Sequence, residues 1–168
     1  MTLAVLILVL VTLQRCGELV LARHNTERLI AQGAFEIAPG HYPAIIAVHS
    51  LWLATLWVLG FTAGVNLAWL FLFCVLQALR IWVIATLGHR WTTRIIVLPG
   101  SPLVRTGPYR WLSHPNYVVV AAEIAVLPLV FGLPWVSLIF SLLNAAVLFV
   151  RIRAENGGLA RTTHAQSG

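Results

Sequence analysis

Residues 114–151 read HPNYVVVAAEIAVLPLVFGLPWVSLIFSLLNAAVLFVR, and this stretch decides the fold. It holds two apolar runs, 116–132 and 134–150, each close to the length of about 20 residues that a helix needs to cross a bilayer. A turn at Gly132 separates the runs, and Pro134 can open the second helix because the first helical N–H has no partner to lose. The stretch therefore predicts a tight antiparallel hairpin of two membrane-spanning helices.

The whole chain has a composition that suits a membrane. Of its 168 residues, 60% are hydrophobic and only 10% are charged, whereas roughly a quarter of the residues are charged in soluble domains. Three earlier spans are expected at 2–22, 43–60 and 65–87. The sequence predicts an all-α integral membrane protein with five transmembrane helices in one domain over 1–160, followed by a flexible C-terminal tail at 161–168.

The net charge of +6 comes from arginine alone, because the chain has neither Lys nor Asp. Such a balance can indicate nucleic-acid binding in a soluble protein, but here its distribution indicates topology. Arginines follow the first, third and fifth spans, whereas the connections at 60–64 and 132–134 are uncharged. Positively charged loops remain in the cytoplasm, so we expect an outside N-terminus, a cytoplasmic C-terminus and no nucleic-acid partner.

Several polar residues interrupt the apolar spans, where they are costly unless they are paired or functional. These residues are Arg15, Glu18, His49, Arg80, Glu123 and Asn144. One interpretation is that ion pairs hold the helices together, for example Arg80 with Glu123. The other is a polar cavity that opens toward the cytoplasm, and the pattern leaves both open.

The two ends of the predicted hairpin carry residues suited to a binding site. Because the helices are antiparallel, His114 at the start of one returns to the same face as Arg151 and Glu155 at the end of the other. Arg151 and Glu155 are spaced i, i+4, so both can point into one pocket. In isolation, His114 could simply cap an interfacial turn.

The loop between the first two spans contains His24, Glu36 and His41, and His49 follows in the next span. These residues lack the local spacing of a zinc site, such as two His one helical turn apart beside Glu. We therefore predict no metal site and interpret this loop as an interfacial lid or a substrate entrance.

At about residues 88–160 the chain resembles the isoprenylcysteine carboxyl methyltransferase family, through Leu103-Val104, Gly107-x-Tyr109, His114-Pro115-x-Tyr117 and Arg151-x-x-x-Glu155-x-x-x-Leu159. The first half is similar to a bacterial branch associated with type III polyketide synthases, through Arg23-x-Asn25, Gly33-Ala34-x-Glu36 and His41-Tyr42-Pro43. The resemblance implies a membrane enzyme of the bacterial inner membrane with its cofactor pocket on the cytoplasmic side.

The resemblance also implies S-adenosylmethionine as cofactor and S-adenosylhomocysteine as product. By position, the residues expected around the cofactor are Leu103, Val104, Tyr109, His114, Pro115, Asn116, Tyr117 and Glu155. Arg151 corresponds to a residue near the methyl acceptor. Ser113 replaces the Arg that commonly precedes His-Pro in the family, which weakens a carboxylate-substrate interpretation.

The leading expectation is O-methylation of a lipophilic acceptor that enters from the bilayer, namely the hydroxyl of a long-chain alkylpyrone or alkylresorcinol. For such an acceptor, Arg151 would stabilise the oxyanion and His114 or Glu123 would remove the proton. The alternatives are carboxyl methylation of a prenylated cysteine, which needs no base, and a non-catalytic lipid-binding protein of the membrane.

Overall fold

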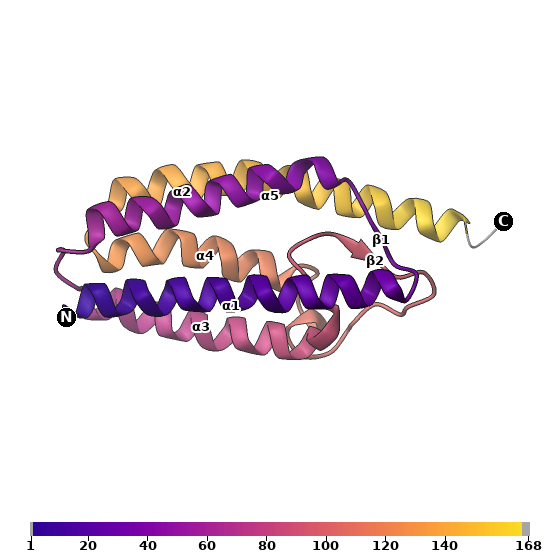
Figure 1. Cartoon of the computed structure of the whole chain (residues 1–168), viewed down its shortest axis with the longest axis horizontal. Coiled ribbons are helices and arrows are strands. Elements are labelled where there is room, and N and C mark those ends of the chain that lie inside the picture. Colours follow the sequence, from indigo (N-terminus) through magenta and orange to yellow (C-terminus); the bar gives the residue numbers. More distant parts are fainter. Residues whose placement is uncertain (1, 166–168) are drawn as a thin grey trace.

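The structure, a computed structural model, describes residues 2–165, with side chains described for 2–40, 42–153 and 155. The described chain forms a bundle whose five α-helices lie nearly along one long axis (Figure 1). The helices are α1 (Leu3–Ala31), α2 (Tyr42–Gly60), α3 (Leu67–Leu87), α4 (Pro115–Val130) and α5 (Pro134–Ala165).

Four helices, α1, α2, α3 and α5, are long and apolar enough to cross a membrane. The fifth, α4, has 16 residues, or about 24 Å at 1.5 Å per residue, which is shorter than the hydrocarbon core of about 30 Å. Large apolar side chains are exposed along the outer faces of the bundle, for example Phe71 at 72% and Trp135 at 74%. The protein is therefore an all-α integral membrane protein, because lipid is the solvent that such faces require.

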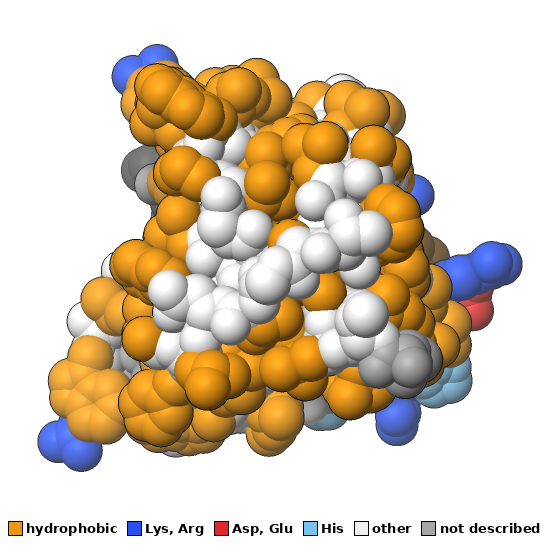
Figure 2. Space-filling view, turned by 90° about the vertical axis from the view of Figure 1, so that its left-hand side faces the viewer, with side chains coloured by type: hydrophobic (Ala, Val, Ile, Leu, Met, Phe, Trp, Pro, Cys, Tyr) orange, Lys and Arg blue, Asp and Glu red, His pale blue; other side chains and the backbone are white. Residues whose placement is uncertain are grey.

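The two ends of the bundle differ in charge. Figure 2 views the end that carries the N-terminus, and its centre shows hydrophobic side chains and uncharged surface, with charged groups only near the margins. At this end, the Asn66 side chain caps α3 by accepting from the backbone N–H groups of Ala68 and Trp69, and the backbone N–H of Asn66 donates to Val130 O of α4 at 2.8 Å. Short connections therefore close this end without a charged loop.

The pairing of α4 and α5 follows from contacts near both of their ends. Ser137 at the start of α5 donates to Ala125 O of α4 at 2.6 Å, and Tyr117 at the start of α4 contacts Arg151 and Glu155 of α5. Gly132 connects the two helices with φ of +69°, in the left-handed region that glycine enters without steric cost.

The main apolar core occupies the half of the bundle near this uncharged end. It includes Leu8 of α1, Leu56 of α2 and Leu127 of α4, none of which is exposed to solvent. The other half, nearer the long loops, is left for polar side chains and cavities. The packing of the helices thus places a rigid apolar base behind the site.

The long loops contain a small two-stranded ribbon that the all-helical expectation missed. The strands are β1 (Phe35–Glu36) and β2 (Ile96–Val97), paired antiparallel with Phe35 opposite Val97. Three short 3₁₀ turns, η1 (Pro39–His41), η2 (Gly88–Arg90) and η3 (Gly107–Arg110), complete the loops. Of the tail expected at 161–168, the first part continues α5 to Ala165, and residues 166–168 lie outside the described residues.

Candidate functional site

A cavity of about 830 Å³ lies at the loop-bearing end, between the 88–114 loop, the start of α4 and the end of α5. Nearly all the residues expected at the cofactor contribute to its wall, together with Arg151: Leu103, Val104, Tyr109, His114, Asn116, Tyr117 and Glu155. Pro115 does not line it, because this residue is buried at the first position of α4. The loop and the two helix ends therefore form one site.

Three of these side chains form a hydrogen-bonded chain. The Tyr117 hydroxyl donates to Glu155 Oε2 at 2.5 Å and accepts from Arg151 Nε at 2.8 Å. Arg151 also donates through a terminal guanidinium nitrogen to Thr93 O at 2.7 Å, and only 6% of this residue is exposed. The chain fixes a cation, a phenol and a carboxylate in the wall of the cavity, and charge-assisted bonds of this kind are the stronger ones.

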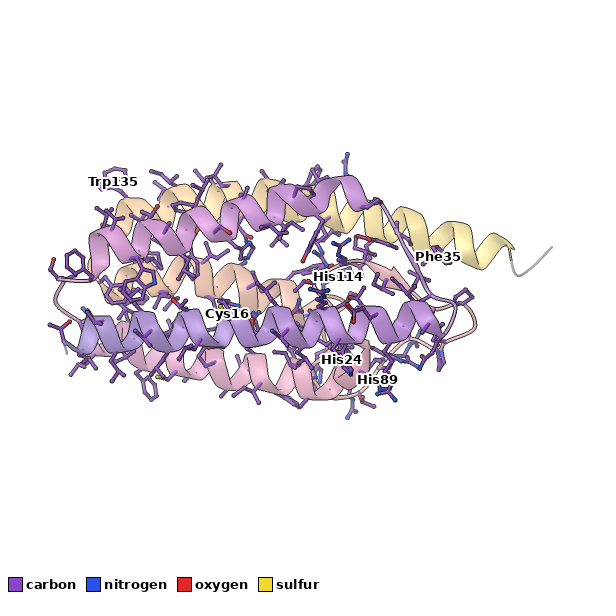
Figure 3. All side chains as sticks on the ribbon, viewed as in Figure 1. Cys16, His24, Phe35, His89, His114 and Trp135 are labelled. Carbon is purple, nitrogen blue, oxygen red and sulfur yellow. The ribbon has the colours of Figure 1, made fainter. Side chains whose placement is uncertain are left out.

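His114 lies at the loop-bearing end, where Figure 3 also labels His24 and His89. It occupies the N-cap position of α4 but makes no capping hydrogen bond through its side chain. Its ring stacks on Tyr117, with 5.2 Å between ring centroids, and its Nδ1 is 3.8 Å from Glu155 Oε2. The imidazole is thus held beside the carboxylate and faces the cavity rather than the helix backbone.

Tyr109 reaches the cavity from η3, which begins at Gly107. Gly107 has φ of +54°, and a Cβ at this position would lie 2.6 Å from Thr86 Oγ1, so glycine lets the loop lie against α3. Burial raises the pKa of the Tyr109 phenol above its ordinary value, and the charge of Glu155 raises it further. The phenol therefore remains neutral and can donate a hydrogen bond at physiological pH.

The segment after α3 contributes parts of the site that the sequence did not reveal. The Trp91 indole donates to Asn116 Oδ1 at 3.3 Å, and Asn25 of α1 donates to Trp91 O at 2.8 Å. Tyr42 and Thr93 share a hydrogen bond of 2.9 Å between their hydroxyls. The resemblance had marked Asn25 and Tyr42, but nothing in the pattern had connected them with Trp91 or Thr93.

A second cavity of about 270 Å³ lies deeper in the bundle. Four residues line both cavities, namely Thr92, Asn116, Tyr117 and Arg151. The second cavity also reaches the exposed faces of α1 and α2, where Cys16, labelled in Figure 3, and Ile46 contribute to its lining. A route thus leads from the outer surface of these two helices to the wall of the first cavity.

Glu123, which we expected as one of two possible bases, lines neither cavity. Its side chain is fully buried in a four-residue ion cluster that we define as Arg15, Glu18, Arg80 and Glu123. Arg15 and Arg80 donate to Glu123 Oε2 at 2.8 and 2.9 Å, and Gln77 donates to Oε1 at 2.7 Å. Both carboxylate oxygens are thus occupied by protein donors, and Glu123 forms the ion pair between helices that the sequence left open as one interpretation.

Comparison with known proteins connects these observations to a family. The sequence profile of the isoprenylcysteine carboxyl methyltransferase (ICMT) family matches residues 67–161, from α3 through the loop to α5. The chain belongs to this family. Membership of the ICMT family makes it a membrane methyltransferase and confirms the family resemblance.

A similar relative of this ICMT chain is YpbQ of Bacillus subtilis (strain 168), an uncharacterized protein. The two are 40% identical over 159 residues, which is 92% of this chain and 95% of the relative. No solved structure gives a significant match. Because the match to YpbQ covers 92% of this chain, it extends into the N-terminal helices that the family profile leaves out.

Proposed function

We propose that this protein transfers the methyl group of S-adenosylmethionine to a hydroxyl oxygen of a lipophilic acceptor, with a long-chain alkylpyrone or alkylresorcinol as the leading class. The observation that carries the proposal is the junction of the two cavities at Asn116, Tyr117 and Arg151. A water-soluble donor can occupy the larger cavity while an acceptor with a lipid tail occupies the smaller one. Holding two reactants at one junction is most of what a displacement reaction requires.

The larger cavity fits the proposed cofactor in size and chemistry. Its volume of about 830 Å³ falls within the range of about 300 to 1,000 Å³ found for small-molecule sites. Arginines such as Arg90 and Arg105 can hold a carboxylate, Glu155 can hold an ammonium group, and Leu103 and Val104 offer apolar surface to an adenine ring. When bound, the cofactor supplies an electrophilic methyl group on a sulfonium sulfur and leaves as S-adenosylhomocysteine.

The protein's own residues then position and activate the acceptor. Arg151 lines both cavities, so its guanidinium can stabilise the oxyanion as the oxygen approaches the methyl carbon. Of the two bases expected from the sequence, His114 is the one that lines a cavity, and it can take the hydroxyl proton. The surrounding helices exclude bulk water, which would compete for the methyl group.

Carboxyl methylation of a prenylated cysteine is the alternative, favoured by the general activity for which the family is named. A carboxylate acceptor is already ionised above about pH 6, given a reference pKa near 4, so its methylation should then vary little with pH. A hydroxyl must lose a proton, so its rate should rise with pH until ionisation is complete. Ser113, in place of the family's usual Arg, favours the hydroxyl.

The decisive experiment supplies the purified protein and S-adenosylmethionine with alkylpyrone, alkylresorcinol or farnesylated cysteine, and detects methylated products by mass spectrometry across pH 6 to 10. We expect methyl ethers of the polyketide lipids, a rate that rises with pH, and an Arg151→Ala variant whose rate falls more than its cofactor affinity. Methylation of farnesylated cysteine alone, with a flat pH profile, would establish the alternative. Cofactor binding without methylation of any acceptor would point to a non-catalytic lipid-binding protein.

We further propose that all five helices span the membrane as an antiparallel array, with the N-terminus outside and the larger cavity open to the cytoplasm. The arginine distribution and the uncharged end in Figure 2 support this orientation. In a chain freed of its two exposed cysteines, Cys16 and Cys74, a new cysteine at Gly64 or Gly132 should react with an impermeant thiol reagent from outside. One at Ser101 should react only after the cytoplasmic face is opened, and the reverse pattern would invert the orientation.

A further inference from the structure

The smaller cavity contains polar groups that no other described residue uses. Asn144 on α5 is 2% exposed, yet its side-chain amide has no hydrogen bond with any described group, and it lines this cavity. His49 on α2 lines the same cavity and bonds through Nδ1 to Ile45 O at 2.8 Å. A carbonyl can only accept, so Nδ1 carries the proton, and Nε2 of the neutral ring is left as an acceptor without a partner among the described residues.

His49 and Asn144 lie at the same depth in the bundle. Tyr42 of α2 and Arg151 of α5 both form a hydrogen bond with Thr93, so these two residues lie at a similar position along the long axis of the bundle. The two helices run in opposite directions (Figure 1). His49 follows Tyr42 by seven residues and Asn144 precedes Arg151 by seven, so each lies about 10 Å further from the loop-bearing end.

The neighbouring wall adds to this unsatisfied polarity. In the described part of the chain, two side-chain nitrogens with almost no accessible surface have no hydrogen-bond partner, Arg15 Nε and Trp52 Nε1. Both belong to side chains in the lining of the smaller cavity. Buried polar groups in folded proteins nearly always have partners, and an apolar tail alone could supply none to Asn144 or His49.

We infer that His49 and Asn144 form a second polar subsite, which binds a hydroxyl group of the acceptor other than the one that is methylated. A hydroxyl matches both residues, because it can donate to His49 Nε2 and accept from the Asn144 amide. The acceptor head is therefore a ring with two hydroxyl groups, one at the junction and one at this subsite, as in an alkylresorcinol. The second oxygen of a hydroxypyrone is a carbonyl, which can accept from Asn144 but cannot donate to His49. The inference rests on the proposed function and specifies the acceptor class.

The subsite also limits the reaction to one methyl group. After transfer, the product carries an ether oxygen at the junction and retains its hydroxyl at His49 and Asn144. Were the product to bind in the reverse direction, its ether would face His49 and could not donate a proton to it. A monomethyl ether should therefore be the end product, and a poor substrate.

The test compares a 5-alkylresorcinol with the 3-alkylphenol of the same chain length, which lacks the second hydroxyl. For the unmodified protein we expect kcat/KM to favour the resorcinol by at least about tenfold, since an unpaired buried group costs a factor of that order or more. Asn144→Leu and His49→Phe should each reduce that preference several-fold. His49→Gln, which keeps an acceptor near the position of Nε2, should retain most of it.

The control is Ser141→Ala, which changes α5 one turn before Asn144, outside the cavity lining, and should keep the preference unchanged. The same lipids are also compared in binding without the cofactor, by native mass spectrometry. Equal binding and equal turnover of both lipids by the unmodified protein would overturn the subsite while leaving the proposed function standing. Preferential binding of the resorcinol without methylation of either lipid would support the subsite and overturn the proposed function. Should the variants fail to fold, the preference of the unmodified protein decides the matter.

Discussion

The ion cluster of Arg15, Glu18, Arg80 and Glu123 and the chain of Arg151, Tyr117 and Glu155 use similar residues in one helical bundle. In the first, the charges balance and Glu123 has both oxygens occupied by protein donors. In the second, Arg151 and Glu155 face a large cavity, and Glu155 remains 23% exposed. The comparison contrasts a carboxylate whose two oxygens both accept from protein donors with one that still faces a cavity, and we expect only the second to bind a ligand.

The strongest challenge to this contrast is Glu123→Leu, which removes a fully buried carboxylate and leaves the partly or almost fully buried Arg15 and Arg80 with fewer partners. Removing one member of a buried pair costs about 3 to 5 kcal/mol. We expect the free energy of unfolding in detergent to fall by this order, measured by reversible denaturation. A variant as stable as the unmodified protein would show that the cluster is not what holds α1, α3 and α4 together.

Glu155→Gln should have the opposite profile. Stability should change little, because this side chain is partly exposed, but affinity for S-adenosylmethionine should fall about tenfold to hundredfold, as expected for a charged hydrogen-bond partner at about 1.5 to 3 kcal/mol. Calorimetric titration measures the affinity, and Glu27→Gln, at an exposed pair with Arg23, is the matched control. Unchanged affinity would remove Glu155 from the proposed site.

Tyr117→Phe removes only the hydroxyl that joins Arg151 to Glu155. A hydrogen bond contributes about 0.5 to 1.5 kcal/mol net, so methyl transfer should slow about two- to tenfold, with a smaller change in cofactor affinity. Single-turnover kinetics separates the two quantities. A loss as large as that of Arg151→Ala would mean that the hydroxyl itself takes part in the reaction.

The smallest effect is expected at the surface pair of Arg94 and Glu36, which are 41% and 20% exposed at the side chain. Solvent screening limits such pairs to less than about 1 kcal/mol. Glu36→Gln should therefore shift the unfolding midpoint only slightly, and its cofactor affinity should stay within about twofold. A large loss of affinity would instead show that the β1–β2 ribbon orders the cavity wall.

Hydropathy located the apolar helices but not where they end. The first span was expected to stop at residue 22, yet α1 continues to Ala31, where Arg23 and Glu27 form an i, i+4 ion pair and Thr26 bonds back to Ala22 O. Apolar content marks the membrane, whereas helical hydrogen bonding can continue beyond it. The β1–β2 ribbon was missed because two-residue strands have no period, and their pairing depends on bringing together loops that are distant in the sequence.

The parts of the site that consist of side chains could be predicted from the sequence, whereas those that consist of backbone groups could not. Arg151 and Glu155 were expected together from their i, i+4 spacing, and the structure brings both to one cavity. Thr93 contributes its carbonyl oxygen to Arg151, and a carbonyl has no signature in sequence. For Glu123 the sequence left two interpretations open, an ion pair with Arg80 or a place in a polar cavity, and the structure shows the ion pair.

The ion cluster also has a consequence for biogenesis. Arg80 is the only Asp, Glu, Lys or Arg residue within α3 and Glu123 the only one within α4, so each helix would enter the bilayer alone at a penalty of about 2.5 to 3.5 kcal/mol for its charge. Their direct bond removes an isolated charge from both at once. The insertion machinery therefore gains by releasing α3 and α4 into lipid as a pair, after the 88–114 loop has been translated. A nascent chain stalled before residue 123 has only Glu18 to balance both Arg15 and Arg80, so membrane quality control meets an excess positive charge.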